Sequence, residues 1–312
     1  MTILLLETLH PDAELLLAKA DTLLRARDPN VPDVDLADVR AILTRGRGRI
    51  EESLMAQCPR LAVIARAGAG LDNLDTAFAR RRGLPVIYAP GGSASTVAEH
   101  TLALLLDLSR GITRSARDVR SGSWENRSHY HGEEICGLTL GIIGFGNIGR
   151  RVAQLASAFG MKIRVAEHRS GAPPHGCDHE VVSLDQLLGT ADAVSLHLSL
   201  TPQTRGILGA REIAKMKPGA LLINTARGAL VDMHAVRVAL ERGTLGGFAA
   251  DVLDVEPPDA NDPLLKFENV VLTPHVASLT SATYRRICMS TAANVICVLR
   301  GEAPDPGSVY RR

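Results

Sequence analysis

The sequence has few aromatic residues, few cysteines and almost no net charge. Aromatic side chains make up 3% of its 312 residues, and 35 Lys and Arg face 34 Asp and Glu, for a net charge of +1. Without a basic excess, no global field favours binding to nucleic acid or to a membrane surface. The five cysteines are odd in number and show no CxxC spacing, which predicts reduced thiols and a cytoplasmic location.

Long hydrophobic runs and metal-ligand motifs are also scarce. No apolar run is long enough to span a bilayer, and the N-terminal MTILLLETLH, which Glu7 interrupts, predicts a core strand rather than a signal peptide. His175, Cys177 and His179 are metal-ligand residue types, but they lie in a Gly/Pro-rich loop without further matched ligands. We therefore expect no metal site, with a metal ion bound by this loop as the alternative.

The most informative stretch is residues 138–160, LTLGIIGFGNIGRRVAQLASAFG. Residues 138–143 are typical of a buried strand, and residues 147–159 repeat apolar side chains at helical spacing. Between such elements, a GxGxxG turn allows a tight bend, the approach of a pyrophosphate and close packing of the helix on the strand. The pattern predicts dinucleotide binding, with a purely structural turn as the alternative. The candidate cofactor-binding residues of the turn are Gly144, Gly146, Asn147, Ile148 and Gly149.

Strand and helix patterns alternate along both halves of the chain, which predicts an α/β protein of two domains. A long helix over residues 96–120 and another over 281–299 would each run from one domain to the other. The expected fold is two Rossmann-like or flavodoxin-like parallel-sheet domains with a cleft between them, one of residues 1–95 plus 285–312 and one of residues 96–284. Strands are expected at residues 2–6, 39–44, 61–65, 85–88, 138–143, 162–166, 193–197, 220–224, 247–251 and 270–272.

The choice of cofactor depends on the turn that follows the expected strand at residues 162–166. Glu167 lies there, close to the usual spacing of about 20 residues beyond the glycines, where a carboxylate bonds the adenosine ribose and repels a 2′-phosphate. Arg169 follows and could accommodate that phosphate. The sequence therefore predicts NAD, with NADP possible.

Three stretches late in the chain carry reactive side chains at the ends of predicted strands, where open α/β sheets bind ligands. They are residues 224–232 (NTARGALVD), 251–257 (DVLDVEP) and 273–277 (TPHVA). With these motifs, with RAGAGLDN at residues 66–73 and with VAEHT at residues 97–101, the sequence resembles the D-isomer-specific 2-hydroxyacid dehydrogenase family over nearly its whole length. It is most similar in style to the phosphoglycerate dehydrogenase branch.

The resemblance implies an oxidoreductase that transfers a hydride between NAD(H) and a small anionic D-2-hydroxy acid or 2-keto acid. Arg227 would hold the substrate carboxylate with its planar fork of donors. His275 would be the general acid and base at the carbonyl oxygen, and Glu256 would orient the imidazole and favour its protonated form. The expected catalytic residues are therefore Arg227, Glu256 and His275.

The resemblance also implies roles for the two domains. Residues 96–284 would form the NAD-binding domain, and residues 1–95 plus 285–312 the substrate-binding domain. Because the family usually pairs through its cofactor domains, we expect a homodimer with residues 124–135 near the contact. Further cofactor contacts are expected at Leu198, Thr225, Ala226, Asp251 and Ser278.

Arginines near the ends of N-terminal strands could bind a second anionic group of the substrate. A solvated basic face is the alternative, and we favour it for Arg47 and Arg49. The candidate substrate-binding residues are Arg45, Arg66, Ala67, Gly68, Ala69 and Gly70.

Several substrate classes share these motifs. Phosphoglycerate-like oxidation and the reduction of glyoxylate or hydroxypyruvate are the leading classes. The alternatives are a dinucleotide-sensing, corepressor-like binding protein and a phosphite-type anion dehydrogenase on the same fold. Formate enzymes of this fold have a glutamine where Glu256 stands, which counts against formate.

Overall fold

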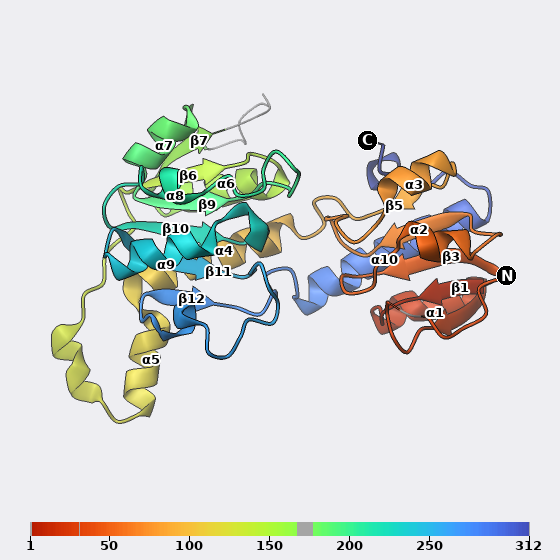
Figure 1. The fold of residues 1–312 in the computed structure, drawn as a ribbon, viewed down its shortest axis with the longest axis horizontal. Helices are drawn as coiled ribbons and strands as arrows, with labels where there is room; N and C mark the ends of the chain where they lie inside the picture. The colour runs from red at the N-terminus through yellow and green to blue at the C-terminus, as the bar shows by residue number, and fades with distance from the viewer. Residues whose placement is uncertain (1, 31, 167–176, 312) are drawn as a thin grey trace. The chain divides into compact units, whose positions relative to one another are not determined.

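The computed structural model describes residues 2–30, 32–166 and 177–311. The chain divides into two compact units, residues 1–93 with 279–312 and residues 94–278, and each has its own parallel β-sheet (Figure 1). The second boundary lies at Leu279 rather than at residue 285. The helix that follows this boundary packs on the sheet of the first unit through residues such as Ile287 and Val295.

The first unit has a five-stranded sheet in the order β2-β1-β3-β4-β5. Its strands are β1 (Thr2–Leu5), β2 (Thr22–Arg25), β3 (Val39–Thr44), β4 (Val63–Arg66) and β5 (Val86–Ile87). Its helices are α1 (Pro11–Ala20), α2 (Glu52–Ala56), α3 (Thr76–Arg81), α10 (Ser281–Leu299) and the 3-10 turn η4 (Pro306–Ser308). Because successive side chains of a strand point to opposite faces, Ile3 and Leu5 pack with α1 and α10, whereas Leu4 and Ile42 pack with α2 and α3.

The second unit has a seven-stranded sheet in the order β12-β11-β10-β9-β6-β7-β8. Its strands are β6 (Thr139–Ile143), β7 (Lys162–Ala166), β8 (His179–Val181), β9 (Ala193–Leu196), β10 (Ala220–Asn224), β11 (Leu245–Ala250) and β12 (Val270–Leu272). The order reverses between β6 and β9, which is the switch point where open parallel sheets bind ligands. Both sheets are parallel, so the predicted α/β architecture is confirmed.

Helices cover both faces of this second sheet. The helical segments are α4 (Ala94–Arg110), α5 (Ile112–Arg120), α6 (Asn147–Ala158), α7 (Leu184–Thr190), α8 (Ala210–Ile213), α9 (Met233–Glu241), η1 (Trp124–His129), η2 (Gly228–Leu230) and η3 (Pro263–Lys266). On one face, Leu102 of α4 and Val152 of α6 pack on strand residues such as Ile142. On the other face, Leu187 of α7 and Val236 of α9 pack on strand residues in a second hydrophobic cluster.

The structure differs from the predicted elements at three places. The helix expected over residues 96–120 is broken at Gly111, whose φ of +56° ends α4 and starts α5. The sequence did not predict strands β2 and β8, because they are short edge strands in which at least half of the residues are exposed, so they lack a clear apolar pattern. Within the described residues, no helix is long and apolar enough to cross a membrane.

The structure describes only part of the loop that was the alternative metal site. His175 lies outside the described residues. Cys177 is buried with its Sγ 3.2 Å from Oγ of Ser157, and the ring of His179 lies 4.6 Å from the ring of Phe145. Both described side chains thus make packing contacts beside β8.

Candidate active site

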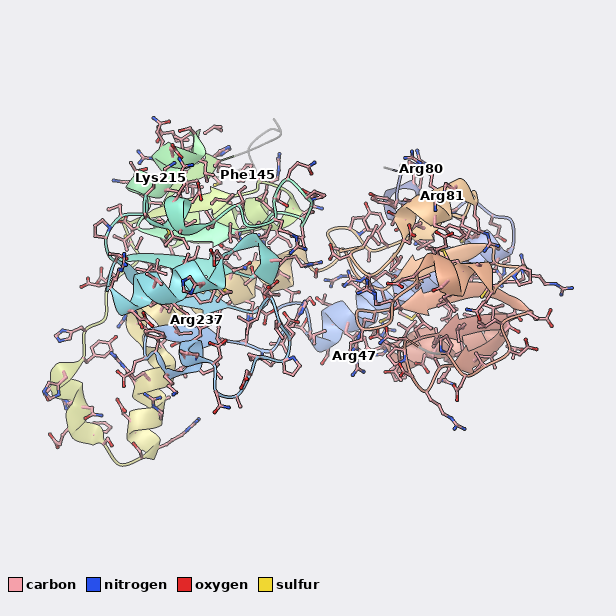
Figure 2. All side chains as sticks on the ribbon, in the orientation of Figure 1. Arg47, Arg80, Arg81, Phe145, Lys215 and Arg237 are labelled. Carbon is pink, nitrogen blue, oxygen red and sulfur yellow. The ribbon has the colours of Figure 1, made fainter. Side chains whose placement is uncertain are left out.

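The glycine turn joins β6 to α6 at the carboxyl end of the sheet. Gly144 has a φ of +96°, a conformation that residues with a side chain rarely adopt. A Cβ on Gly149 would lie 2.1 Å from the carbonyl oxygen of Gly144, so the helix reaches this position only with glycine there. Figure 2 shows Phe145 within this turn. The turn has the shape that the sequence pattern predicts.

The helix start behind the turn leaves room for an anion. Asn147 and Ile148 open helix α6, and no side chain among the described residues caps it at Gly146. A Cβ on Gly146 would meet no atom within 4 Å, so the space over the turn is open. Because the first amides of a helix have no partner within the helix, they attract negative charge. These residues therefore fit the pyrophosphate of a dinucleotide.

The residues that follow β9 pack against this turn. A Cβ on Gly144 would lie 2.7 Å from the carbonyl oxygen of His197 and 2.9 Å from Cδ2 of Leu198, so Leu198 packs against the turn, and its contact with the cofactor stays a prediction. Nε2 of His197 lies 2.8 Å from Oγ of Ser195. Burial of the His197 ring lowers its pKa to about 3, so the ring is neutral near pH 7.

Arg227 follows β10 in a loop that Asn224 holds. Nδ2 of the buried Asn224 donates to the carbonyl of Arg227 at 2.8 Å, and its Oδ1 accepts from the amide of Ala226 at 3.0 Å. Thr225 is buried, with its Oγ1 2.9 Å from Oγ1 of Thr101. The guanidinium of Arg227 is half-buried and donates to the carbonyl of Ala226 at 2.7 Å. This backbone fixes the direction in which Arg227 leaves the sheet.

The Arg227 loop packs directly on the segment that carries Glu256. A Cβ on Gly228 would lie 2.0 Å from the carbonyl carbon of Leu253 and 2.3 Å from the amide nitrogen of Asp254. Only glycine allows two backbones to approach this closely. The glycine after Arg227 therefore lets the backbone of this loop pack against the segment that leads to Glu256.

Glu256 and His275 form a hydrogen-bonded pair. Nδ1 of His275 lies 2.8 Å from Oε2 of Glu256, and Oε1 of Glu256 accepts from the amide of Leu253 at 2.9 Å. The His275 side chain is 50% exposed and the Glu256 side chain 39%, so a ligand can reach the ring. A carboxylate on Nδ1 fixes the tautomer and leaves Nε2 for proton transfer.

The backbone of His275 is held by Asp251. The Asp251 side chain is 2% exposed and accepts from the amides of Val276 and Ala277, each at 2.8 Å, and from Oγ1 of Thr273 at 2.5 Å. The His275 amide donates to the carbonyl of Asp251 at 2.9 Å. The structure thus shows Asp251 as the anchor of the His275 loop, and its expected contact with the cofactor stays a prediction.

The remaining cofactor candidates differ in what the structure shows of them. Ser278 is half-buried at the end of the second unit. Glu167 and Arg169, which bear on the choice between NAD and NADP, lie outside the described residues.

The loop after β4 in the first unit carries Arg66 and the candidate substrate amides of Ala67, Gly68, Ala69 and Gly70. Arg66 folds over its own loop: a Cβ on Gly68 would lie 3.0 Å from its Nη1, which also donates to the carbonyl of Gly70. Ala69 is exposed, whereas Ala67 is buried. Arg66 therefore shapes this loop, and its contact with substrate stays a prediction.

Arg45 lies in the loop after β3, and sequence reasoning missed the residue that holds this loop. The Arg45 guanidinium carbon lies 5.1 Å from the centroid of the Tyr284 ring. Oε1 of Glu7 accepts from the amides of Gly46 and Gly48 at 2.9 and 2.6 Å. Burial acts to raise the pKa of Glu7, but hydrogen bonds from Gly48, Gly46 and Thr44 outweigh it and leave that pKa below its ordinary value. The only sequence signal was a carboxylate within an apolar run.

Comparison with known proteins agrees with this geometry. Residues 102–277 match the NAD-binding domain of the D-isomer-specific 2-hydroxyacid dehydrogenases. The chain belongs to this family. The match lies within the second unit and contains the glycine turn, Arg227, Glu256 and His275. The family predicted from the motifs is confirmed, and the protein is an NAD(P)-dependent 2-hydroxyacid dehydrogenase.

Relatives of this dehydrogenase act on several substrates. A glyoxylate reductase of Aeropyrum pernix is 40% identical over 285 residues, which cover 87% of this chain and 83% of that protein. A D-3-phosphoglycerate dehydrogenase of Mycobacterium bovis is 38% identical over 89% of this chain, but the matched part is about half of that protein, at 52%. The crystal structure of D-lactate dehydrogenase from Aquifex aeolicus, complexed with NAD and lactic acid, matches with a TM-score of 0.89 and 29% identity over 99% of this chain and 98% of that one.

Proposed function

We propose that this dehydrogenase reduces a small 2-keto acid of the glyoxylate or hydroxypyruvate type to the 2-hydroxy acid, with NADH as the preferred cofactor. The observation that carries the proposal is the 2.8 Å hydrogen bond between His275 and Glu256. This pair lies in the unit that also holds the glycine turn and Arg227. An acid/base, an anion clamp and a dinucleotide turn in one unit are what hydride transfer to a keto acid needs.

In the proposed reaction, His275 supplies the proton. A nicotinamide held by the glycine turn would supply the hydride that the carbonyl carbon receives. As the new C–H bond forms, Nε2 of the protonated His275 gives its proton to the carbonyl oxygen, and the ring becomes neutral. The Glu256 carboxylate accepts the Nδ1 proton and keeps Nε2 available for the transfer. In the reverse direction, neutral His275 takes the hydroxyl proton, so the same pair serves both directions.

Arg227 is proposed to hold the substrate carboxylate. Its planar guanidinium can make two parallel hydrogen bonds to a carboxylate and orient the neighbouring carbonyl. The hydrogen bonds from Asn224 to the loop backbone support this role because they fix the start of the side chain. Arg45, Arg66 and the 67–70 loop are proposed to bind the other end of the substrate.

The glycine turn is proposed to hold the cofactor pyrophosphate. The open space over Gly146 and the uncapped start of α6, as the described residues show them, support this role. Thr225, Ala226, Leu198 and Ser278 are proposed to line the rest of the cofactor. The preference for NAD over NADP rests on the carboxylate of Glu167 in the sequence.

The choice of a small keto acid rests on the relatives. The glyoxylate reductase aligns with this chain over 83% of its own length, whereas the phosphoglycerate dehydrogenase aligns over 52%. Phosphoglycerate-like oxidation is the second candidate, because arginines stand near the strand ends of the first unit, and its phosphate would need them.

We propose that the protein is a cytoplasmic homodimer. Exposed apolar side chains on α5 and η1 support the pairing of two subunits, because Val119 is 56% exposed and Trp124 is 60% exposed. Both residues line a pocket of about 360 Å³. The odd number of cysteines without CxxC spacing supports a reducing compartment. Light scattering of the purified protein tests the dimer directly.

A substrate panel tests the function. Absorbance of the reduced nicotinamide is followed with glyoxylate, hydroxypyruvate, phosphohydroxypyruvate and oxaloacetate, each with NADH and NADPH, and with phosphite in the presence of NAD. We expect the highest kcat/KM with glyoxylate or hydroxypyruvate and NADH. Turnover of phosphite alone, or binding of NADH without turnover of any keto acid, would contradict the proposal; the second result would favour a dinucleotide-sensing protein.

A further inference from the structure

Helix α4 carries two adjacent polar side chains, His100 and Thr101, that contact two different catalytic loops. Nε2 of His100 lies 2.9 Å from Oγ1 of Thr273, in the loop of His275. Oγ1 of Thr101 lies 2.9 Å from Oγ1 of Thr225, in the loop of Arg227. The two loops follow different strands, β12 and β10, and α4 is one continuous helix. One helix therefore binds the segment of the proton donor and the segment of the carboxylate clamp.

The direction of each hydrogen bond follows from proton counting. Oγ1 of Thr273 donates its one proton to Oδ1 of Asp251 at 2.5 Å, so it must accept from His100, whose Nε2 carries a proton. Oγ1 of Thr101 donates to the carbonyl of Val97 at 2.8 Å, so it accepts from Thr225. His100, Thr273 and Asp251 form one chain of donors and acceptors that ends on the carboxylate.

The His275 loop needs such support. His275 has a φ of +57° and is the one residue other than glycine with a positive φ among the described residues. A left-handed backbone costs a non-glycine residue energy and persists only where its surroundings hold it. The chain that starts at His100 ends on the carboxylate that binds the amides of Val276 and Ala277.

We propose that His100 and Thr101 are positioning residues that hold the loops of His275 and Arg227 in fixed positions relative to each other. The proton donor and the carboxylate clamp can then contact the same keto acid. The inference rests on the function proposed above. His100 acts through Thr273 and Asp251 on the His275 backbone, and Thr101 acts through Thr225 on the Arg227 loop. Neither touches the reacting atoms.

Conservative variants separate positioning from general stability. His100→Leu removes the donor and His100→Gln keeps a donor near the position of Nε2; Glu99→Leu, at an exposed site on the same helix, is the matched control. We expect His100→Leu to lower kcat about 10- to 100-fold with the Kd for NADH unchanged, and His100→Gln to recover most of the loss. Thr101→Val should raise KM for the keto acid more than it lowers kcat, and Thr101→Ser should restore it.

A purely structural role would give a different result. If His100→Leu lowers the unfolding temperature but keeps kcat within about twofold of the wild type, or behaves like Glu99→Leu, the inference is overturned. Hydrogen exchange of the Val276 and Ala277 amides gives a readout that does not depend on turnover. Should the wild type reduce no keto acid, the proposed function fails, while faster exchange in His100→Leu would still support the hold on the loop and unchanged exchange would refute it.

Discussion

Oε2 of Glu256 lies 2.8 Å from Nδ1 of His275, across the two loops that follow β11 and β12. This hydrogen bond assigns Nδ1 to the carboxylate and Nε2 to the proton that is transferred. The carboxylate thereby fixes the orientation of the imidazole.

Glu256→Gln keeps the shape of the pair and removes its charge. Because a neutral amide stabilises a protonated imidazole less than a carboxylate does, we expect kcat for keto acid reduction to fall about 10- to 100-fold with the Kd for NADH unchanged. Steady-state kinetics and fluorescence titration of NADH measure the two quantities. Asp254→Asn, which removes an exposed charge from the same loop, is the control and should have little effect; an equal loss in both variants would speak against a role for the pair.

Arg227→Lys keeps the positive charge but loses the planar fork. A single ammonium cannot make two parallel hydrogen bonds to a carboxylate, so we expect kcat/KM for the keto acid to fall about 100-fold. The unfolding temperature should hardly change, since Asn224 binds the backbone of the loop rather than the guanidinium. Wild-type kinetics in Arg227→Lys would place the carboxylate elsewhere.

Alanine substitutions at two glycines of the turn should have different effects, one on NADH binding and one on stability. Gly146→Ala meets no atom within 4 Å, so it should fold normally but weaken NADH binding at least about tenfold, because the added methyl group takes the space of the pyrophosphate. In Gly149→Ala the methyl group would lie 2.1 Å from the carbonyl oxygen of Gly144, and the unfolding free energy should fall by about 1–3 kcal/mol. Calorimetry and titration of NADH distinguish the two variants. Tight NADH binding by Gly146→Ala would show that the pyrophosphate does not bind at this turn.

Glu7 should make the stability depend on pH in the acid range. Burial acts to raise its pKa, but hydrogen bonds from Gly48, Gly46, Thr44 and Arg47 together leave the pKa in the folded protein below the ordinary value of 4.5. As the pH falls, Glu7 therefore binds a proton in the unfolded chain before it does so in the folded protein. The stability that the Glu7 carboxylate contributes is present above about pH 4.5 and is lost as the pH falls through the folded-state pKa.

Glu7→Gln tests this directly. Denaturant unfolding should show a loss of about 1–3 kcal/mol at pH 7, since buried amides lose a charged acceptor, and a smaller further loss below pH 4.5 than in the wild type. Glu51→Gln, in an exposed pair with Arg49, is the matched control. An unchanged acid slope in Glu7→Gln would show that other carboxylates carry the pH dependence.

Much of the fold and part of the site could be predicted from short-range patterns. The buried strand β6, the glycine turn and helix α6 follow from apolar spacing within one stretch, and parallel strands bring the loops of Arg227, Glu256 and His275 to one edge of the sheet. Edge strand β8 could not be predicted, because half-exposed strands have weak periodicity.

Contacts between residues far apart in the chain could not be predicted. Glu7 binds a loop 41 residues away, and His100 contacts Thr273 across 173 residues. Neither residue carries a local signal for its partner: Glu7 only interrupts an apolar run, and His100 lies on an amphipathic helix. The positive φ of His275 likewise depends on the tertiary contacts of Asp251.

The central claim is that His275 delivers the proton to a keto acid. Its most direct test compares turnover and NADH affinity in His275→Ala and in the wild type with the best substrate of the panel. We predict that kcat falls about 10²- to 10⁴-fold while the Kd for NADH stays within about twofold. Turnover by His275→Ala near the wild-type rate would contradict the account and assign the proton transfer to another group.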